Sequence, residues 1–220
     1  MTKMENIKPI LITGASRGLG AAMAEVLAAP NRHIIAVART TGALEELDDR
    51  IQNAGGSATL APMDVTDAGA MAHLCNSIHQ RWGGLSGWIH CAIHVPPLSP
   101  ADHIDEKDFA KSIDLNVTAT SRLITFVAPL LSADDAQAVF VEDRNMQSKF
   151  SGAYSASKAA QIALAKAWAA ECERTGPKIS IVAPKPMPTA TRARFFPGED
   201  RASLTPPIAE AKRILAELGL

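Results

Sequence analysis

The chain has 220 residues, of which 47% are hydrophobic and 20% charged, and it carries a formal net charge of −1. This length and balance fit a single soluble globular domain over residues 1–220, and they exclude the basic surface of a nucleic-acid-binding protein and the long apolar run of a membrane span. Three cysteines without CxxC spacing, and no signal-peptide pattern, predict a cytoplasmic protein with reduced thiols.

Short runs rich in isoleucine and valine alternate with longer helical patterns along the chain. We expect strands at Pro9–Thr13, His33–Ala38, Ser57–Ala61, Ser86–Cys91, Ala136–Val141 and Lys178–Ala183. We expect helices at Gly18–Ala29, Gly42–Ala54, Asp67–Arg81, Glu106–Leu131, Ala153–Arg174 and Ile208–Leu218. Strands this apolar are buried on both faces, so the prediction is an α/β fold: a doubly wound, Rossmann-like parallel sheet with helices on both sides.

The segment Pro184–Pro207 holds six of the 14 prolines. Proline lacks a backbone N–H, so we expect neither a regular helix nor a central strand there. The segment leaves the carboxyl end of the last strand, where ligands bind in doubly wound sheets. We interpret it as a substrate-side loop or lid, with a plain connector as the alternative.

A glycine-rich turn, TGASRGLG, follows the first strand at residues 13–20. Glycine allows a sharp turn and a close approach of the backbone to a diphosphate. The next helix would direct its free N–H groups and its positive dipole end toward that phosphate. The turn predicts cofactor contacts from Gly14, Ser16, Arg17, Gly18, Leu19 and Gly20.

A second pattern, YSASK, places Tyr154 and Lys158 four residues apart, on one face of a helix. Free tyrosine has a pKa of about 10 and is a poor proton donor or acceptor near neutrality. A nearby ammonium group stabilises the phenolate, so we expect Lys158 to lower the pKa of Tyr154. The alternative is an ordinary pair of residues on a surface helix.

Taken together, the GxxxGxG turn and the YxxxK pattern resemble the short-chain dehydrogenase/reductase family over nearly the whole chain. Asp64 and Val65 look like the family's adenine-contacting pair, and Asn116 looks like its mid-helix active-site asparagine. The resemblance implies that Tyr154 is the acid in carbonyl reduction and the base in alcohol oxidation. It also implies that Lys158 binds the nicotinamide ribose and that Asn116 holds a water that relays the proton.

The end of the second strand indicates which cofactor is bound. Enzymes that select NAD place a carboxylate there for the ribose 2′-OH. Here the sequence is AVART, with Arg39 and no acidic residue. A guanidinium binds a 2′-phosphate bidentately, and Arg17 could contact its other side. We predict NADP rather than NAD; the alternative is that both arginines are merely solvated.

The family usually has a serine just past the fifth strand, where this chain has Glu142 or Asp143. A carboxylate has the wrong sign for a developing oxyanion unless it is protonated. Rearrangement of the loop could bring Ser148 or Ser151 to that place instead. The chain is therefore expected to be a divergent member that lacks the usual serine.

Two further departures flank the expected cofactor. Ile93 replaces a family glycine after the fourth strand, which implies a shifted backbone or a crowded cofactor. Lys185 replaces the glycine of a Pro-Gly pair beside the nicotinamide. Thr189 or Thr191 would still supply the threonine that meets the carboxamide.

His90, Cys91 and His94 lie close together in the sequence and are of the types that bind metal ions. Neighbours on a strand point to opposite faces, and zinc needs three or four converging ligands. We therefore expect no metal and interpret the histidines as satisfied strand-end or surface residues.

Our leading hypothesis is an NADP-dependent oxidoreductase that transfers hydride between the nicotinamide and a small carbonyl or alcohol substrate. The alternative is a catalytically impaired nucleotide-binding or scaffold protein of the same fold. The resemblance also implies a homodimer or higher homo-oligomer formed through Glu106–Leu131 and Ala153–Arg174.

Overall fold

The computed structural model describes residues 7–131, 135–144 and 149–220. Within these residues six strands form one parallel sheet in the order β3-β2-β1-β4-β5-β6. The strands are β1 (Ile10–Thr13), β2 (His33–Ala38), β3 (Ser57–Pro62), β4 (Gly87–His90), β5 (Gln137–Val141) and β6 (Lys178–Val182). Each predicted strand agrees with the observed one to within one residue at either end, and the predicted fold class is confirmed.

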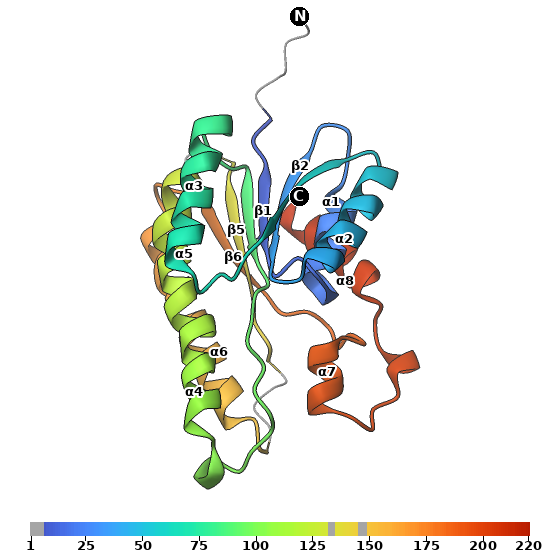
Figure 1. Ribbon diagram of the computed structural model, residues 1–220, viewed down its shortest axis with the longest axis vertical. Helices are drawn as coiled ribbons and strands as arrows, with labels where there is room; N and C mark the ends of the chain where they lie inside the picture. Colours follow the sequence, from blue (N-terminus) through green and yellow to red (C-terminus); the bar gives the residue numbers. More distant parts are fainter. Residues whose placement is uncertain (1–6, 132–134, 145–148) are drawn as a thin grey trace, which may run out of the picture.

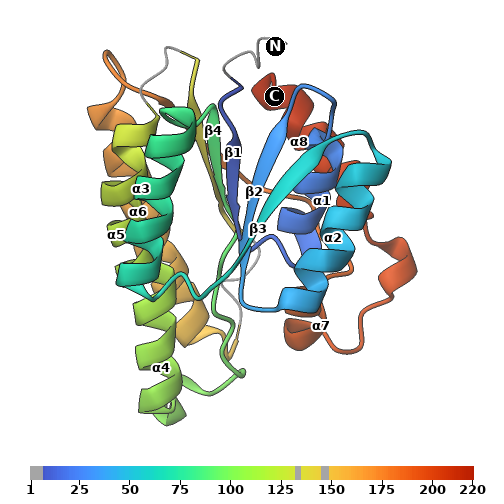
Figure 2. The same ribbon diagram turned by 45° about the horizontal axis from the view of Figure 1, so that its top comes forward.

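Helices cover both faces of the sheet (Figures 1 and 2). One face carries α1 (Gly18–Leu27), α2 (Thr41–Asn53) and α8 (Pro207–Leu218). The other carries α3 (Ala68–Trp82), α4 (Glu106–Ile113), α5 (Thr120–Val127) and α6 (Gly152–Glu171). Successive strand residues point to opposite faces, so each face has its own core. Leu11, Val37 and Trp88 pack on the α3–α6 side, whereas Ile12, Ile34 and Ile89 pack on the α1–α8 side.

The order of the strands places the ligand crevice. β1 pairs with β2 on one side and with β4 on the other, so the chain winds in opposite directions from β1. In open α/β sheets ligands bind at this switch point, outside the carboxyl ends of the strands. Within the described residues, no helix is long and apolar enough to cross a bilayer.

The single long helix expected over Glu106–Leu131 is wrong in detail. The chain there forms α4, then a π-helical segment at Asp114–Ala119, then α5, and ends in a 3-10 turn at Ala128–Leu130. The Thr120 hydroxyl donates to the carbonyl oxygen of Asn116 at 2.9 Å, within the wider turn. Such wide turns are rare overall but often occur at functional sites. They change the spacing of apolar residues very little, so the sequence pattern did not reveal this one.

The exclusion of helix from Pro184–Pro207 is also wrong. Residues Ala190–Phe195 form a short helix, α7, and Arg201–Ser203 form a 3-10 turn. Proline disrupts a helix only near its own position, and the stretch between Pro188 and Pro197 contains none. The Thr189 hydroxyl caps α7 by accepting from the backbone N–H of Arg192 at 3.2 Å.

Candidate active site

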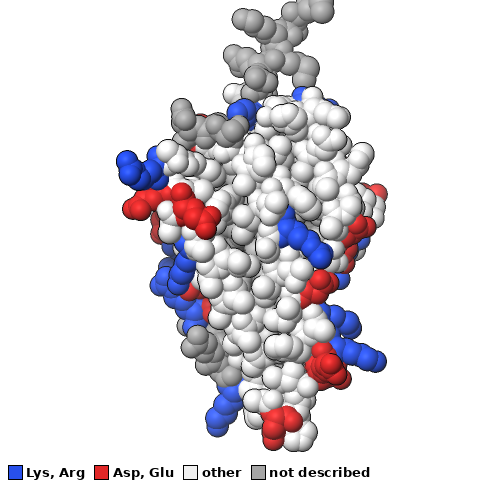
Figure 3. Space-filling view, turned by 90° about the vertical axis from the view of Figure 1, so that its left-hand side faces the viewer, with Lys and Arg blue, Asp and Glu red and all other residues white. Residues whose placement is uncertain are grey.

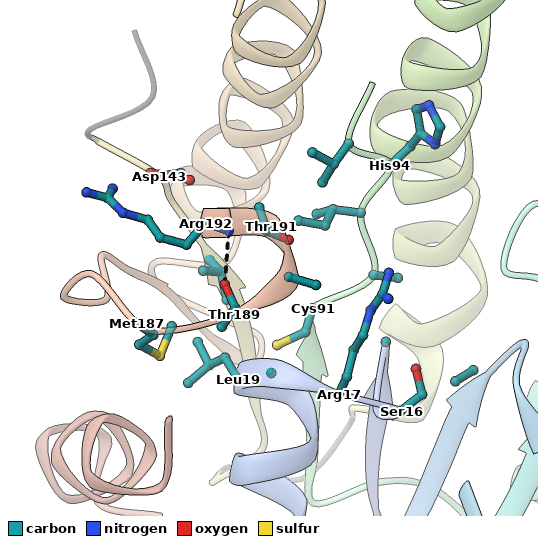
Figure 4. Close-up of a pocket in the computed structure, with 18 of the residues that line it drawn as sticks. Ser16, Arg17, Leu19, Cys91, His94, Asp143, Met187, Thr189, Thr191 and Arg192 are labelled. Atoms are coloured by element: carbon teal, nitrogen blue, oxygen red, sulfur yellow. Dashed lines mark hydrogen bonds between the residues drawn. The ribbon is translucent and has the colours of Figure 1, made fainter. Parts of the chain in front are cut away.

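A cleft of about 650 Å³ lies at the carboxyl ends of the strands, between the glycine turn, α6 and the segment that carries α7 (Figure 4). Most of the residues predicted for the site come together along its walls. Those that line it are Gly14, Ser16, Arg17, Gly18, Leu19, Arg39, Asp64, Val65, Tyr154, Lys158 and Thr189.

Two glycines shape the turn through tight backbone packing. Gly14 has φ +81°, and a Cβ on it would lie 2.5 Å from the backbone nitrogen of Ala92, beyond the end of β4. Gly20 is not among the residues that line the cleft; a Cβ there would lie 2.3 Å from the carbonyl oxygen of Gly14. Because Gly20 has no side chain, the first turn of α1 can pack directly against the backbone of Gly14. Because Gly14 has none, the glycine turn can pack against the backbone that follows β4.

Asn116 also lies outside the cleft wall, and it is buried. Its Oδ1 accepts from the backbone N–H of His94 at 2.7 Å. Its Nδ2 donates to the carbonyl oxygen of His94 at 3.0 Å and to Ser157 Oγ at 2.9 Å. The side chain thus ties the segment after β4 to α6, and its role in a proton relay stays a prediction.

The predicted adenosine end combines a guanidinium with a carboxylate. Arg39 Nη1 lies 3.7 Å from Asp64 Oδ2, and 64% of the Arg39 side chain is exposed. Asp64 Oδ1 accepts from the backbone N–H and the hydroxyl of Thr66 at 3.0 and 2.9 Å. Arg17, at the start of α1, extends from the turn along the cleft in Figure 4. Arg39 therefore keeps most of its surface accessible to a ligand.

Tyr154 lies at the other end of the cleft, on α6, and is only 2% exposed. Its hydroxyl donates to Asp143 Oδ2 at 3.5 Å, and the Phe195 ring packs on it with centroids 5.0 Å apart. Burial, and then the negative charge of Asp143, raise the pKa of Tyr154 well above its usual value. The expected lowering of this pKa by Lys158 is wrong, because burial and the carboxylate dominate.

Lys158 lies beneath Tyr154 on the same face of α6. Its ammonium donates to the carbonyl oxygen of Val141 at 2.7 Å and to the side-chain oxygen of Gln161. The amide of Gln161 donates in turn to Thr120 Oγ1 at 2.9 Å. Burial lowers the pKa of Lys158 to about 8.

His90 completes this buried polar network. One ring nitrogen lies 2.7 Å from Thr13 Oγ1, and the other lies 3.0 Å from Thr120 Oγ1 and 3.3 Å from the Gln161 amide nitrogen. Burial lowers the pKa of His90 to about 3, so the ring is neutral. The interpretation of His90 as a satisfied strand-end histidine is confirmed. The same interpretation is wrong for His94, because its buried Nε2 has no hydrogen-bond partner among the described residues. Within the described part of the chain, no cluster of residues suited to a metal ion is found.

Sequence reasoning missed Gln161 and the role of α7. The signal for Gln161 was a polar residue three positions after Lys158, which places it on the same face of the helix. α7 brings Phe195 onto Tyr154, and Arg194 donates to the carbonyl oxygen of Val95 across the cleft. The substrate-side role of this segment stays a prediction, although much of the segment lines the cleft.

The departures from the family pattern also have positions in the structure. Asp143 lines the cleft at the place of the expected serine, whereas Glu142 is paired with Arg144 at 2.8 Å. Ser151 Oγ lies 2.9 Å from Ser155 Oγ and is not among the residues that line the cleft. Ser148 lies outside the described residues.

Three more predicted neighbours of the cofactor line the cleft: Ile93, Lys185 and Thr191. Ile93 is partly buried and packs with the pair formed by Tyr154 and Phe195. The residue that replaces the family glycine therefore forms part of the wall at the Tyr154 end.

Comparison with known proteins agrees with this geometry. The family model described as short chain dehydrogenase matches residues 8–200. A fatty acyl-CoA reductase of Acinetobacter baylyi is 33% identical over 184 residues, which are 80% of this chain and 61% of that protein, so the chain spans less than two thirds of its length. An uncharacterised oxidoreductase of Staphylococcus aureus is 28% identical over 209 residues, or 93% of this chain and 88% of that one.

Among solved structures, a short chain dehydrogenase from Shigella flexneri 2a complexed with NADP is 25% identical, with a TM-score of 0.86 over 96% of this chain and 89% of that one. The family match covers most of the chain and includes both the glycine turn and the YxxxK pattern. This chain therefore belongs to the short chain dehydrogenase family.

Proposed function

We propose that this chain is an NADP-dependent oxidoreductase that reduces a small carbonyl compound or oxidises the corresponding alcohol. The observation that carries the proposal is the position of Tyr154 and Lys158 in the same cleft as the glycine turn and Arg39. The proton-transfer residues and the phosphate-binding turn thus face one space that has the size of a ligand site.

The residues at the turn end of the cleft fit a phosphorylated dinucleotide. The turn brings backbone N–H groups at the start of α1 to the cleft, and Arg17 and Arg39 would hold a 2′-phosphate. Lys158 would hold the nicotinamide ribose, with Thr189 at the carboxamide. When bound, NADPH supplies the hydride. The likeness to the NADP complex from Shigella flexneri supports NADP as the cofactor.

The Tyr154 end holds the proton that carbonyl reduction requires. Because the pKa of Tyr154 is raised, its hydroxyl keeps its proton near neutral pH and can donate it to a substrate oxygen. Oxidation would require the same group to lose its proton first, beside a carboxylate.

A second candidate, a catalytically impaired nucleotide-binding or scaffold protein, is favoured by one observation. Asp143 stands beside Tyr154 where the family has a neutral serine, and a negative charge there opposes a developing oxyanion. Such a protein would bind NADPH without oxidising it.

Turnover in a matched variant separates the two candidates. NADPH oxidation is followed with small aldehydes and ketones as substrates. A fatty acyl-CoA is included because the relative from Acinetobacter is a fatty acyl-CoA reductase. Tyr154→Phe should lower turnover by about 100-fold or more while NADPH affinity, measured by fluorescence titration, stays nearly unchanged. NADPH binding without oxidation of any compound by the wild type would favour the second candidate, and equal turnover in Tyr154→Phe would overturn the assignment of Tyr154.

We also propose a homodimer formed through α5 and α6. Figure 3 shows this side of the molecule, where charged side chains lie mostly at the edges and the middle is largely uncharged. The exposed positions of α6 include a row of small apolar residues, Ala156, Ala159, Ala163, Ala167 and Ala170. Small residues allow two helices to approach closely. Sedimentation at micromolar concentration should show a dimer, and a monomer alone would refute the proposal. The cytoplasmic location stays a prediction.

A further inference from the structure

Residues 184–189 follow β6 and form one wall of the cleft, which we call the proline wall. Their sequence is PKPMPT, so a proline stands at every second position. Because proline has no backbone N–H, neither a strand ladder nor a helix can hold this stretch. Thr189, at its end, is the residue proposed to meet the carboxamide of the nicotinamide. The position of the proline wall therefore depends on contacts from other parts of the chain.

Glu210, on α8, makes the contact at the start of the proline wall. Its Oε1 accepts from the backbone N–H of Lys185 at 2.8 Å, and the side chain is only 1% exposed. Arg213, three residues farther along α8, donates to both carboxylate oxygens of Glu210, at 2.5 and 3.1 Å. These hydrogen bonds from Arg213 lower the pKa of Glu210, so the buried carboxylate stays ionised near neutral pH. Its hydrogen bond with the peptide of Lys185 is therefore charge-assisted.

The ionised side chain stands out among the residues that α8 buries. The other three are apolar: Ala211, Ile214 and Leu215. Apolar side chains in place of a buried ion pair are often as stabilising as the pair, or more so. What Glu210 provides, and an apolar residue would not, is an acceptor for the N–H of Lys185.

The proline wall also meets the glycine turn, so its position affects the width of the cleft. α8 packs against α1, which begins in that turn. Met187, in the middle of the wall, is buried in the same core as Leu19 of α1. Figure 4 shows Met187 and Thr189 beside Leu19. A Cβ added to Gly18 would lie 3.5 Å from Cγ2 of Thr189. A displacement of the wall at Lys185 would therefore change the cleft at the place proposed for the nicotinamide.

We propose that Glu210 is a positioning residue for the nicotinamide half of the cofactor. It is not among the residues that line the cleft, and it acts through the backbone of Lys185, which it holds at the start of the proline wall. Arg213 in turn neutralises the buried carboxylate. This inference rests on the proposed function, because it places the nicotinamide of NADPH at this wall.

Binding of the whole cofactor and of its adenosine half tests this inference, and neither measurement requires turnover. Adenosine 2′,5′-bisphosphate carries the 2′-phosphate proposed for Arg17 and Arg39, but it has no nicotinamide. Calorimetry should show that Glu210→Leu binds NADPH about tenfold or more weakly than the wild type, because the cofactor must then order a wall that a charge-assisted hydrogen bond no longer holds. Its affinity for the bisphosphate should stay nearly unchanged.

Two conservative variants separate the reach of the side chain from its charge. Glu210→Gln keeps an acceptor at the same distance from Lys185 but has no charge, and it should recover most of the affinity for NADPH. Glu210→Asp keeps the charge beside Arg213 but is one methylene shorter, and it should bind NADPH nearly as weakly as Glu210→Leu. A role of the charge alone predicts the opposite order.

Two further variants separate positioning from stability. Glu217→Gln removes the other carboxylate that pairs with Arg213, at 2.6 Å on the more exposed side of α8, and should leave the binding of both ligands unchanged. Ile51→Ala opens a cavity in the core at α2, outside the cleft wall. It should lower the urea midpoint while the affinity for NADPH stays the same.

The expected result is a loss confined to NADPH that Glu210→Gln restores and Glu210→Asp does not. Equal losses for NADPH and the bisphosphate in Glu210→Leu and Glu210→Asp would overturn this inference and leave the proposed function intact. Unchanged affinity for NADPH with a lower urea midpoint in the same two variants would do so as well. A wild type that binds neither ligand would overturn both.

Discussion

The ammonium of Lys158 contacts the side-chain oxygen of Gln161, one turn farther along α6. Gln161 is 1% exposed, and its amide nitrogen continues the contact to Thr120. Lys158 is therefore held in position by a hydrogen bond to Gln161 on its own helix, and Gln161 is held in turn by Thr120 on α5. A buried ammonium without such partners would be strongly destabilising, so the network allows Lys158 to stay charged at 7% exposure.

Replacing Gln161 should destabilise the fold. Gln161→Leu removes one acceptor from Lys158 and one donor from Thr120, and leaving buried polar groups unsatisfied costs about 1–3 kcal/mol. Urea unfolding should show a lower midpoint with an unchanged slope. Gln80→Leu, at an exposed position of α3, is the control and should have little effect. Equal stability of the two variants would show that the contacts of Gln161 contribute nothing measurable.

Burial of neutral His90 should make the protein sensitive to acid. Its pKa is about 3 in the folded state and about 6.5 when unfolded, so between these values only the unfolded chain binds the proton. Above pH 6.5 this difference has no effect on the free energy of unfolding. As the pH falls from 6.5 toward 3, the free energy of unfolding decreases by at most about 1.4 kcal/mol per pH unit. Denaturant unfolding between pH 7 and 4 should show a steeper loss for the wild type than for His90→Asn.

The exposed His79 provides the control for that measurement, because His79→Asn should follow the wild-type pH dependence. The same slope in His90→Asn and in the wild type would mean that other groups, such as the partly buried His33, cause the loss.

The strands and the fold class could be predicted from the sequence, because each strand is a short apolar run between helical patterns. Most of the cleft wall was also predictable, since the turn and the YxxxK pattern place backbone and side chains by local geometry. The environment of Tyr154 was not, because its pKa depends on burial under Phe195 and on Asp143, which reach it through tertiary packing. The contacts of Asn116 likewise depend on a π-helical segment that leaves no distinct sequence period.

Gly14→Ala should damage the fold as well as the site. The added Cβ would lie 2.5 Å from the backbone nitrogen of Ala92, at φ +81°, so the turn or the end of β4 must move. We expect a loss of stability of about 1–3 kcal/mol and loss of NADPH binding. Gly42 lies in α2, and a Cβ added there would have no heavy atom of another part of the protein within 4 Å. Gly42→Ala should therefore be neutral or stabilise the fold by roughly 0.4–1 kcal/mol. Thermal unfolding of the pair tests this contrast, and equal melting temperatures would contradict it.

Arg39 should decide the preference between the two cofactors. It is largely exposed at the end of β2 and forms a 3.7 Å ion pair with Asp64, so it can turn to a 2′-phosphate at small cost. Arg39→Ala should weaken NADPH binding by about 10- to 100-fold, the loss expected for hydrogen bonds to a charged group, while NADH binding changes little because NADH lacks that phosphate. Fluorescence titration of both cofactors measures the split. Arg50→Ala, which removes an ion pair with Glu25 outside the cleft, should leave both affinities unchanged. An equal loss for NADPH and NADH in Arg39→Ala would mean that Arg39 contacts a part of the nucleotide that the two cofactors share, and the prediction of NADP would lose its main support.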